Sequence, residues 1–114
     1  MTYRRGDVIL VRYPNSDLLT YKKRPVLVVQ AEEVSTGLSQ RIVALITSNL
    51  ARTGATRVTI QKDSAVGQQM KLLTDSVVMA DNLVTVLDRE VDRVIGHCPM
   101  MEQVDAALKI ALRL

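Results

Sequence analysis

Three consecutive cations, Lys22, Lys23 and Arg24, stand directly before the apolar run PVLVVQA of residues 25–31. A run of this kind and length predicts a buried strand. Its first residue, Pro25, has no N–H to give to a sheet, and it holds the residue before it extended. We therefore expect Arg24 to be an anchored cation at a sheet end, where its planar donors could bind phosphate oxygens.

A hydroxyl group lies across from this arginine if two strands pair as we expect. Residues 41–47, RIVALIT, form another apolar run, and a hairpin through the loop 32–40 pairs positions whose numbers add to 71. Arg24 then falls opposite Thr47. Neighbouring strands lie about 4.8 Å apart, so both side chains could address one group, but a one-residue slip would turn one of them to the other face.

The elements that would position these residues form a small β domain closed by a helix. The segment 56–61 alternates between apolar and polar residues, and ADN at 80–82 is turn-prone. From Pro99, apolar residues recur at three- and four-residue steps, which predicts an amphipathic C-terminal helix packed on the sheet through Met101, Val104, Leu108 and Leu112. Because helices do not alternate with strands, we expect a strongly bent small barrel or half-barrel. The expected strands are 6–13, 25–31, 41–47, 56–61, 76–79, 83–87 and a last strand or irregular piece at 91–98. The longest expected loops are 14–23, 32–40 and 62–75.

Length and composition limit the class of protein. A chain of 114 residues is long enough for one domain, which we expect to span 1–114. No apolar stretch approaches the roughly 20 residues of a membrane-spanning helix, and the N-terminal MTYRRGDV lacks the apolar region of a secretory signal. The single Cys98 cannot form an intramolecular disulfide. The sequence therefore predicts a cytoplasmic protein that is not in a membrane.

Charge is distributed unevenly along the chain. Residues 1–30 contain six Lys or Arg and two Asp, whereas residues 76–114 contain four Lys or Arg and six acidic residues. The formal net charge is +3. A basic face near the N-terminus could bind a polyanion such as nucleic acid, although ordinary charge scatter explains the numbers as well.

Other residue groups do not indicate a metal or a cofactor. His97 and Cys98 are adjacent, so on a strand they point to opposite faces, and the chain has no second His and no Cys pair. Gly54 and Gly67 lie in expected loops without a phosphate-loop pattern. Cys98 is best interpreted as a small buried apolar residue.

Several segments in order resemble one family over nearly the whole chain. They are RRGDVILVRYP, KKRPVLVVQ, RIVALITSN, TDSVVMADNLVTVL and VDAALKIAL. The sequence resembles the MazF/PemK (Kid) toxin endoribonucleases of type II toxin-antitoxin systems. This resemblance implies an SH3-like barrel with a C-terminal helix, a homodimer, and a cognate antitoxin as partner. It also implies metal-independent cleavage of single-stranded RNA, including mRNA, that leaves 2′,3′-cyclic phosphate and 5′-hydroxyl ends.

The resemblance also implies which residues are catalytic. The arginine of the RPxLV segment matches Arg24, the threonine that ends the third strand matches Thr47, and an acidic residue after the SVV-like segment matches Asp81. Arg24 would stabilise charge on the phosphate, Thr47 would donate a hydrogen bond or position the attacking hydroxyl, and Asp81 would accept its proton. The expected RNA-binding residues are Tyr21, Lys22, Lys23, Ser48 and Asn49.

Two departures from the family pattern leave an alternative open. Met79 and Val84 stand where some or many members carry an arginine. The chain could therefore be an SH3-like nucleic-acid or protein-binding module without catalysis. In that case Thr47 could simply bond a neighbouring backbone group, and Asp81 could be an ordinary turn residue.

Overall fold

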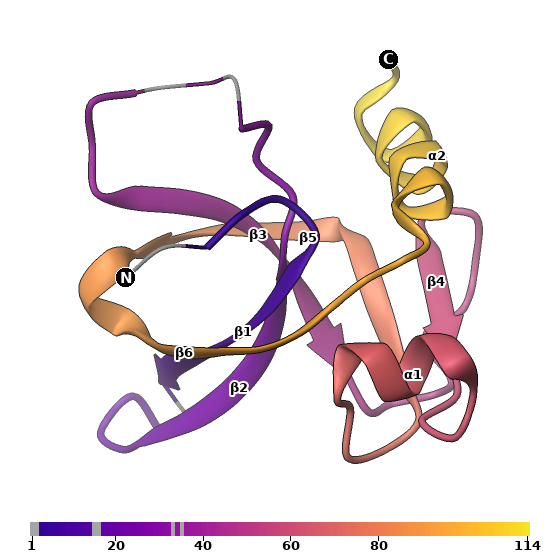
Figure 1. The fold of residues 1–114 in the computed structure, drawn as a ribbon, viewed down its shortest axis with the longest axis horizontal. Coiled ribbons are helices and arrows are strands. Elements are labelled where there is room, and N and C mark those ends of the chain that lie inside the picture. The colour runs from indigo at the N-terminus through magenta and orange to yellow at the C-terminus, as the bar shows by residue number, and fades with distance from the viewer. Residues whose placement is uncertain (1–2, 15–16, 33, 35) are drawn as a thin grey trace.

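A single antiparallel sheet of six strands organises the chain, in the order β4-β5-β3-β2-β1-β6 (Figure 1). The computed structural model describes residues 3–14, 17–32, 34 and 36–114. The predicted mainly β fold with a C-terminal helix is confirmed. The strands are β1 (Asp7–Pro14), β2 (Tyr21–Val28), β3 (Gln40–Thr47), β4 (Arg57–Ile60), β5 (Ser76–Leu87) and β6 (Val91–His97). The helices are α1 (Ala65–Met70), the 3₁₀ turn η1 (Asp88–Glu90) and α2 (Met101–Leu112).

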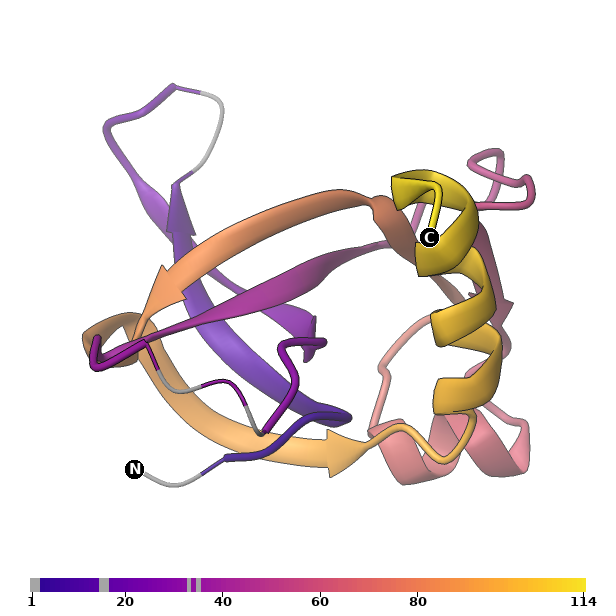
Figure 2. The same ribbon diagram turned by 90° about the horizontal axis from the view of Figure 1, so that it is seen from above.

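The sheet is open but bends into a barrel-like shape, so both of its faces bury apolar side chains. In Figure 2 the strands curve around one side of the molecule, and α2 packs on the other, against β4 and β5. Residues alternate between the faces along each strand. The cluster inside the curve contains Ile9, Val11, Val26, Val28, Val43 and Val86. The cluster on the helical side contains Val8, Leu27, Ala44, Met70, Val78, Val104 and Ala107.

The strand that carries the three cations begins earlier than we expected. β2 starts at Tyr21 instead of residue 25, because it pairs with β1 along its length, from Val8↔Leu27 to Pro14↔Tyr21. Pro25 is therefore an interior residue of β2. Of the expected loops 14–23 and 32–40, residues 15–16, 33 and 35 lie outside the described residues.

The predicted turn at 80–82 is wrong, because β5 runs through it without a break. Its pairing with β3 jumps from Leu45↔Met79 to Ala44↔Leu83, which leaves residues 80–82 without partners on β3. The chain stays extended there because Ala80 N–H donates to Thr56 O at 3.0 Å. The segment is thus a bulge within one long strand.

The loop expected at 62–75 contains the short helix α1, which also places Gly67 in a helix. Ser64 caps its start by accepting a hydrogen bond from Gly67 N–H at 3.0 Å. A Cβ on Gly67 would lie 2.1 Å from Gln61 O, and a Cβ on Gly96 of β6 would lie 2.5 Å from Gln69 O. These two glycines therefore let α1 pack closely against its neighbours.

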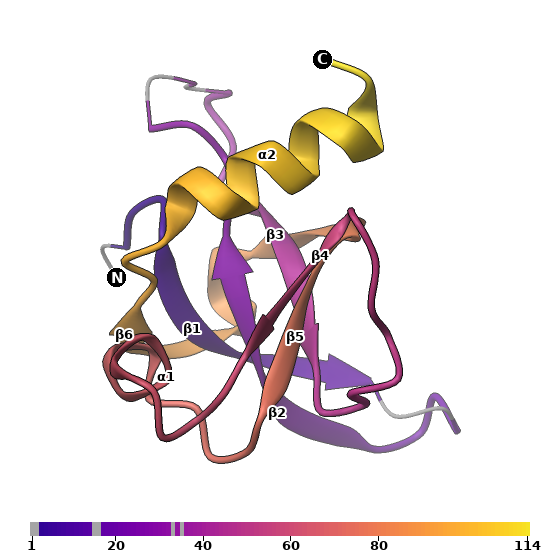
Figure 3. The same cartoon turned by 90° about the vertical axis from the view of Figure 1, so that its right-hand side faces the viewer.

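The C-terminal helix covers one side of the sheet with only part of its predicted apolar face (Figure 3). It begins at Met101, after Pro99, and buries Val104 and Ala107. Leu112 is 53% exposed, so it does not belong to the core as the periodicity suggested. No helix in the described ranges has the length and apolar character needed to cross a membrane.

Candidate active-site groove

A groove opens where β2 and β3 separate. The two strands pair from Val28↔Val43 to Val26↔Leu45, which confirms the register inferred from the sequence. The pairing stops at Pro25, which has no N–H to donate. Both strands continue beyond this point, each held by its other neighbour. A groove of about 740 Å³ lies there, and its lining includes residues of both strands.

Arg24 and Thr47 both line this groove. Each lies two residues beyond the last pair, Val26↔Leu45, so strand alternation places both on the same face of the sheet. Arg24 pairs with Val11 of β1, and Thr47 pairs with Val77 of β5. Their backbones are thus fixed on opposite sides of the groove.

The guanidinium of Arg24 has a donor that the described part of the protein leaves unused. Its Nε is buried and has no hydrogen-bond partner among these residues. A buried N–H without a partner is costly, and native proteins rarely keep one. Because Arg57 Nε, outside this groove, is also buried without a partner among the described residues, the binding role of Arg24 depends on the charge that its guanidinium brings to the groove lining.

Thr47 uses its side-chain oxygen as an acceptor. Its Oγ1 accepts a hydrogen bond from Asn49 N–H at 3.1 Å, which is the backbone role considered from the sequence. A hydroxyl has two lone pairs and one hydrogen, so this bond leaves the hydrogen able to donate. Thr47 can therefore hold its own loop and still bind a phosphate oxygen.

Cations and hydroxyls surround the groove, and none of the described residues that line it is a carboxylate. The lining cations are Lys22, Lys23, Arg24, Lys71 and Arg93. Hydroxyls come from Thr47, Ser48, Thr74 and Ser76, and apolar residues include Leu10, Pro25, Ile46 and Val94. Because charges of one sign that line a cleft reinforce one another's electrostatic potential inside it, this positively charged lining attracts a polyanion.

Sequence reasoning missed Lys71 and Arg93. Lys71 ends α1 in the left-handed conformation (φ 59°), where its N–H donates to Gln68 O and Gly67 O. Arg93 lies next to a bulge in β6, since Leu10↔Arg93 and Val11↔Val91 leave Asp92 unpaired with β1. Both depend on long-range packing that no local pattern indicates.

Asp92 lies between two of the groove cations. Its Oδ2 is 3.3 Å from Lys23 Nζ and 3.9 Å from Arg93 Nε. A β-bulge often re-aims a side chain, and here it directs a carboxylate to cations from β2 and β6. Asp92 therefore offsets part of the positive charge beside the groove.

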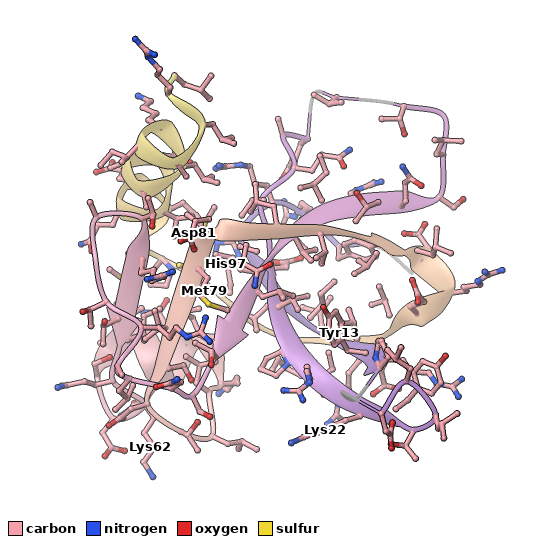
Figure 4. All side chains as sticks on the ribbon, turned by 180° about the vertical axis from the view of Figure 1, so that it is seen from behind. Tyr13, Lys22, Lys62, Met79, Asp81 and His97 are labelled. Atoms are coloured by element: carbon pink, nitrogen blue, oxygen red, sulfur yellow. The ribbon has the colours of Figure 1, made fainter. Side chains whose placement is uncertain are left out.

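Asp81 lies away from the groove. It lies on β5 four residues beyond Val77, the partner of Thr47, which is about 13 Å at the rise of a strand. Its Oδ2 instead accepts from the guanidinium of Arg57 at 2.8 Å. Figure 4 shows Asp81 and Lys22 on well-separated parts of the molecule.

The five residues expected to bind RNA do not all line the groove. Lys22, Lys23 and Ser48 line the groove, but Tyr21 and Asn49 do not. Tyr21 lines a neighbouring hollow, where the guanidinium of Arg12 lies 4.5 Å from its ring centroid. The side-chain oxygen of Asn49 accepts from Ala51 N–H, which shapes the loop after β3.

The two departures from the family pattern and the His97–Cys98 pair have structural explanations. Met79 is buried opposite Leu45, and Val84 packs against the cluster inside the curve of the sheet.

The His97–Cys98 pair has its own contacts. His97 Nδ1 lies 3.0 Å from Asp7 Oδ1. Cys98 is buried, and that burial raises the pKa of its thiol. Within the described ranges, no three potential metal-binding side chains lie close enough to hold an ion.

Comparison with known proteins identifies the family. The sequence model of one family, the PemK-like, MazF-like toxins of type II toxin-antitoxin systems, matches residues 4–112 of the chain. The chain belongs to this family. The predicted resemblance is thus confirmed, and this PemK/MazF-like toxin has relatives among solved structures. A search of curated proteins finds no significant match.

The solved relatives of this PemK/MazF-like toxin share its fold over nearly their whole length. The Mycobacterium tuberculosis toxin MazF-mt6 is 27% identical, with a TM-score of 0.72 and coverage of 95% of this chain and 97% of that one. A mycobacterial endoribonuclease in complex with its cognate antitoxin is 24% identical, with a TM-score of 0.74 and coverage of 99% and 97%. MazF from Deinococcus radiodurans is 19% identical, with a TM-score of 0.69 and coverage of 100% and 99%. The last two similarities bear on the fold alone.

Proposed function

We propose that this toxin is a metal-independent, sequence-specific endoribonuclease that cleaves single-stranded RNA, including mRNA, in the groove between β2 and β3. The observation that carries the proposal is that Arg24 and Thr47 lie on one face of two separating strands and line the same groove, together with four further cations. Membership of the toxin family supports the same activity. Such a substrate would place the protein in the cytoplasm.

The proposed reaction uses the RNA's own 2′-hydroxyl as the nucleophile. The 2′-oxygen attacks the adjacent phosphorus, the bond from phosphorus to the 5′-oxygen breaks, and the products are a 2′,3′-cyclic phosphate and a 5′-hydroxyl. The protein must align these atoms and stabilise the charge that develops on the phosphate oxygens. Arg24 is permanently cationic, so it serves as the charge stabiliser. Thr47 donates a hydrogen bond to the same phosphate.

The proton of the 2′-hydroxyl needs an acceptor, and we assign that role to water. Asp81, the acceptor suggested by the family pattern, is about 13 Å along β5 from the Thr47 partner and is paired with Arg57. The part of the groove lining that the structure describes supplies no carboxylate and no imidazole in its place. Water that takes the 2′-proton and protonates the leaving 5′-oxygen balances the reaction.

The proposed partners follow from the family and from the charge of the groove. A cognate antitoxin would inhibit the toxin by covering the groove, and an acidic segment would suit its five lining cations. A mycobacterial relative has been solved as an endoribonuclease in complex with its cognate antitoxin. We also propose that the toxin acts as a homodimer.

The test is incubation of the purified protein with a long single-stranded RNA in EDTA, followed by mapping of the fragment ends. We expect discrete cuts with 2′,3′-cyclic phosphate ends, and no cuts with Arg24→Ala. The exposed Arg52 lies outside the groove lining, so Arg52→Ala is the matched control and should cut normally.

The second candidate, a binding module without catalysis, is favoured by the absence of a carboxylate or imidazole among the described residues of the groove lining. RNA that is bound but stays intact, in a preparation shown by mass spectrometry to contain no antitoxin, would select this candidate. Cuts that are unchanged by Arg24→Ala would instead refute the assigned site.

A further inference from the structure

A second hollow adjoins the groove, and the proposed reaction does not use it. Its volume is about 540 Å³, and it lies between the far ends of β1 and β2 and the turn η1. Lys22 and Lys23 line both hollows, so the two form one continuous surface. In Figure 2 the paired ends of β1 and β2 project from the body of the molecule. Arg12, Tyr21, Lys22 and Lys23 of these ends are exposed.

The second hollow has unpaired positive charge. Its cations are Arg12, Lys22, Lys23 and Arg89. Its two carboxylates are already engaged: Glu90 accepts from Leu87 N–H at 2.9 Å, and Asp92 pairs with Lys23. Among the described residues, no carboxylate lies within ion-pair distance of the other three cations. A phosphate could therefore bind there without displacing an internal partner.

The same hollow contains an exposed aromatic ring that is held in place. Tyr21 is 52% exposed, and the Arg12 guanidinium lies over its ring at 4.5 Å from the centroid. Arg12 and Tyr21 come from paired strands, in which the pairs Pro14↔Tyr21 and Arg12↔Lys23 lie two residues apart and hence on one face. Aromatic rings and guanidinium planes are the surfaces on which unpaired bases stack.

We propose that this second hollow binds the nucleotides that flank the cleaved phosphate, with one base stacked on the Arg12–Tyr21 pair. The inference rests on the proposed function for its substrate class, single-stranded RNA. The RNA strand runs from the groove over Lys22 and Lys23 into the second hollow, where Arg89 binds one of its phosphates. Stacking, together with phosphate contacts, favours a nucleic acid over an acidic protein segment, which would have no base to stack.

The test measures binding of a 12-nucleotide 2′-O-methyl RNA, which has no 2′-hydroxyl and cannot be cleaved, by fluorescence anisotropy. We expect Tyr21→Ala and Arg12→Ala to weaken binding by about tenfold each, the effect of losing one stacked base. Tyr21→Phe keeps the ring and should bind as wild type. Arg89→Ala should flatten the slope of log affinity against log salt by about 0.7, the value for one phosphate on a single strand.

The control is Lys62→Ala, which removes an exposed cation that lies outside both hollows and far from Lys22 in Figure 4. Wild-type affinity in both Tyr21→Ala and Arg12→Ala, with the fold confirmed by circular dichroism, would overturn the proposal. A 12-residue polyglutamate peptide whose affinity falls with Tyr21→Ala as much as that of the RNA does would assign the hollow to a protein and overturn it too. Because the probe cannot be cut, failure of the proposed cleavage would leave this result standing.

Discussion

Arg24 of β2 and Thr47 of β3 occupy positions that would pair if the ladder between the two strands continued, but the strands separate before reaching them. The ladder between β2 and β3 ends at Val26↔Leu45, and the next pair of this face would join Arg24 to Thr47. Pro25 cannot extend the ladder, so the space between the strands becomes a groove lined by both residues. One proline thus creates a binding site between two strands of a continuous sheet.

Asp81→Asn should affect stability more than catalysis. The change weakens the charge-assisted bond to Arg57, and because both side chains are partly exposed we expect a loss of about 1 kcal/mol in the free energy of unfolding. Thermal unfolding and single-turnover cleavage measure the two effects. A hundredfold loss of cleavage with unchanged stability would place Asp81 in the reaction and contradict our account.

Asp92→Asn should tighten RNA binding. The change removes a carboxylate that competes with phosphate for Lys23 and Arg93. We expect a severalfold lower dissociation constant for non-cleavable RNA and a steeper salt dependence, because more cations are then free to bind phosphates. Asp63→Asn, on an exposed residue that lines neither hollow, is the matched control. Equal affinity in both variants would show that Asp92 does not offset the groove charge.

Gly96→Ala should destabilise the fold and disturb the groove together. The new Cβ would lie 2.5 Å from Gln69 O and 2.6 Å from the carbonyl carbon of Met70, so α1 and the Lys71 that follows it must shift. We expect a loss of about 2 kcal/mol in the free energy of unfolding, measured by urea denaturation. Gly37→Ala meets no atom within 4 Å and should cost only the strain of its positive φ, about 1 kcal/mol.

Cys98 should resist thiol reagents in the folded protein. Burial raises the pKa of its thiol, so less of the reactive thiolate is present at a given pH than in the unfolded chain. Because the thiol pKa is higher in the folded protein than in the unfolded chain, the free energy of unfolding should fall as the pH rises past the ordinary thiol pKa of 9.0. Alkylation by iodoacetamide at pH 8 should be slow without denaturant and fast in guanidinium chloride. Equal rates would contradict the buried placement.

The sequence predicted the parts of this fold that depend on strong local patterns. The apolar runs indicated β2 and β3, and the hairpin assumed to be centred on the loop between them has the observed register, which places Arg24 and Thr47 on one face. The pattern failed at 80–82, where ADN has turn-forming residues but a hydrogen bond from Ala80 to Thr56 keeps the strand extended. It also failed at α1, because six residues are too short to show a helical period.

The site was predictable only where its residues come from those strands. Lys71 enters the groove through the left-handed end of α1, and Arg93 through a bulge in β6. Both placements depend on contacts between elements that are distant in the sequence. Asp81 shows the opposite case, because a position that matches a family pattern lies outside the groove of this chain.

The most direct test of the central claim is a double-mutant cycle on single-turnover RNA cleavage with Arg24→Ala, Thr47→Val and the double variant. If both side chains act on one phosphate, each single change should slow cleavage by about a hundredfold or more, and the double variant should be only slightly slower than Arg24→Ala. Thr47→Ser keeps the hydroxyl and should retain most activity. Single effects that multiply in the double variant, or normal cleavage by Arg24→Ala, would contradict the account.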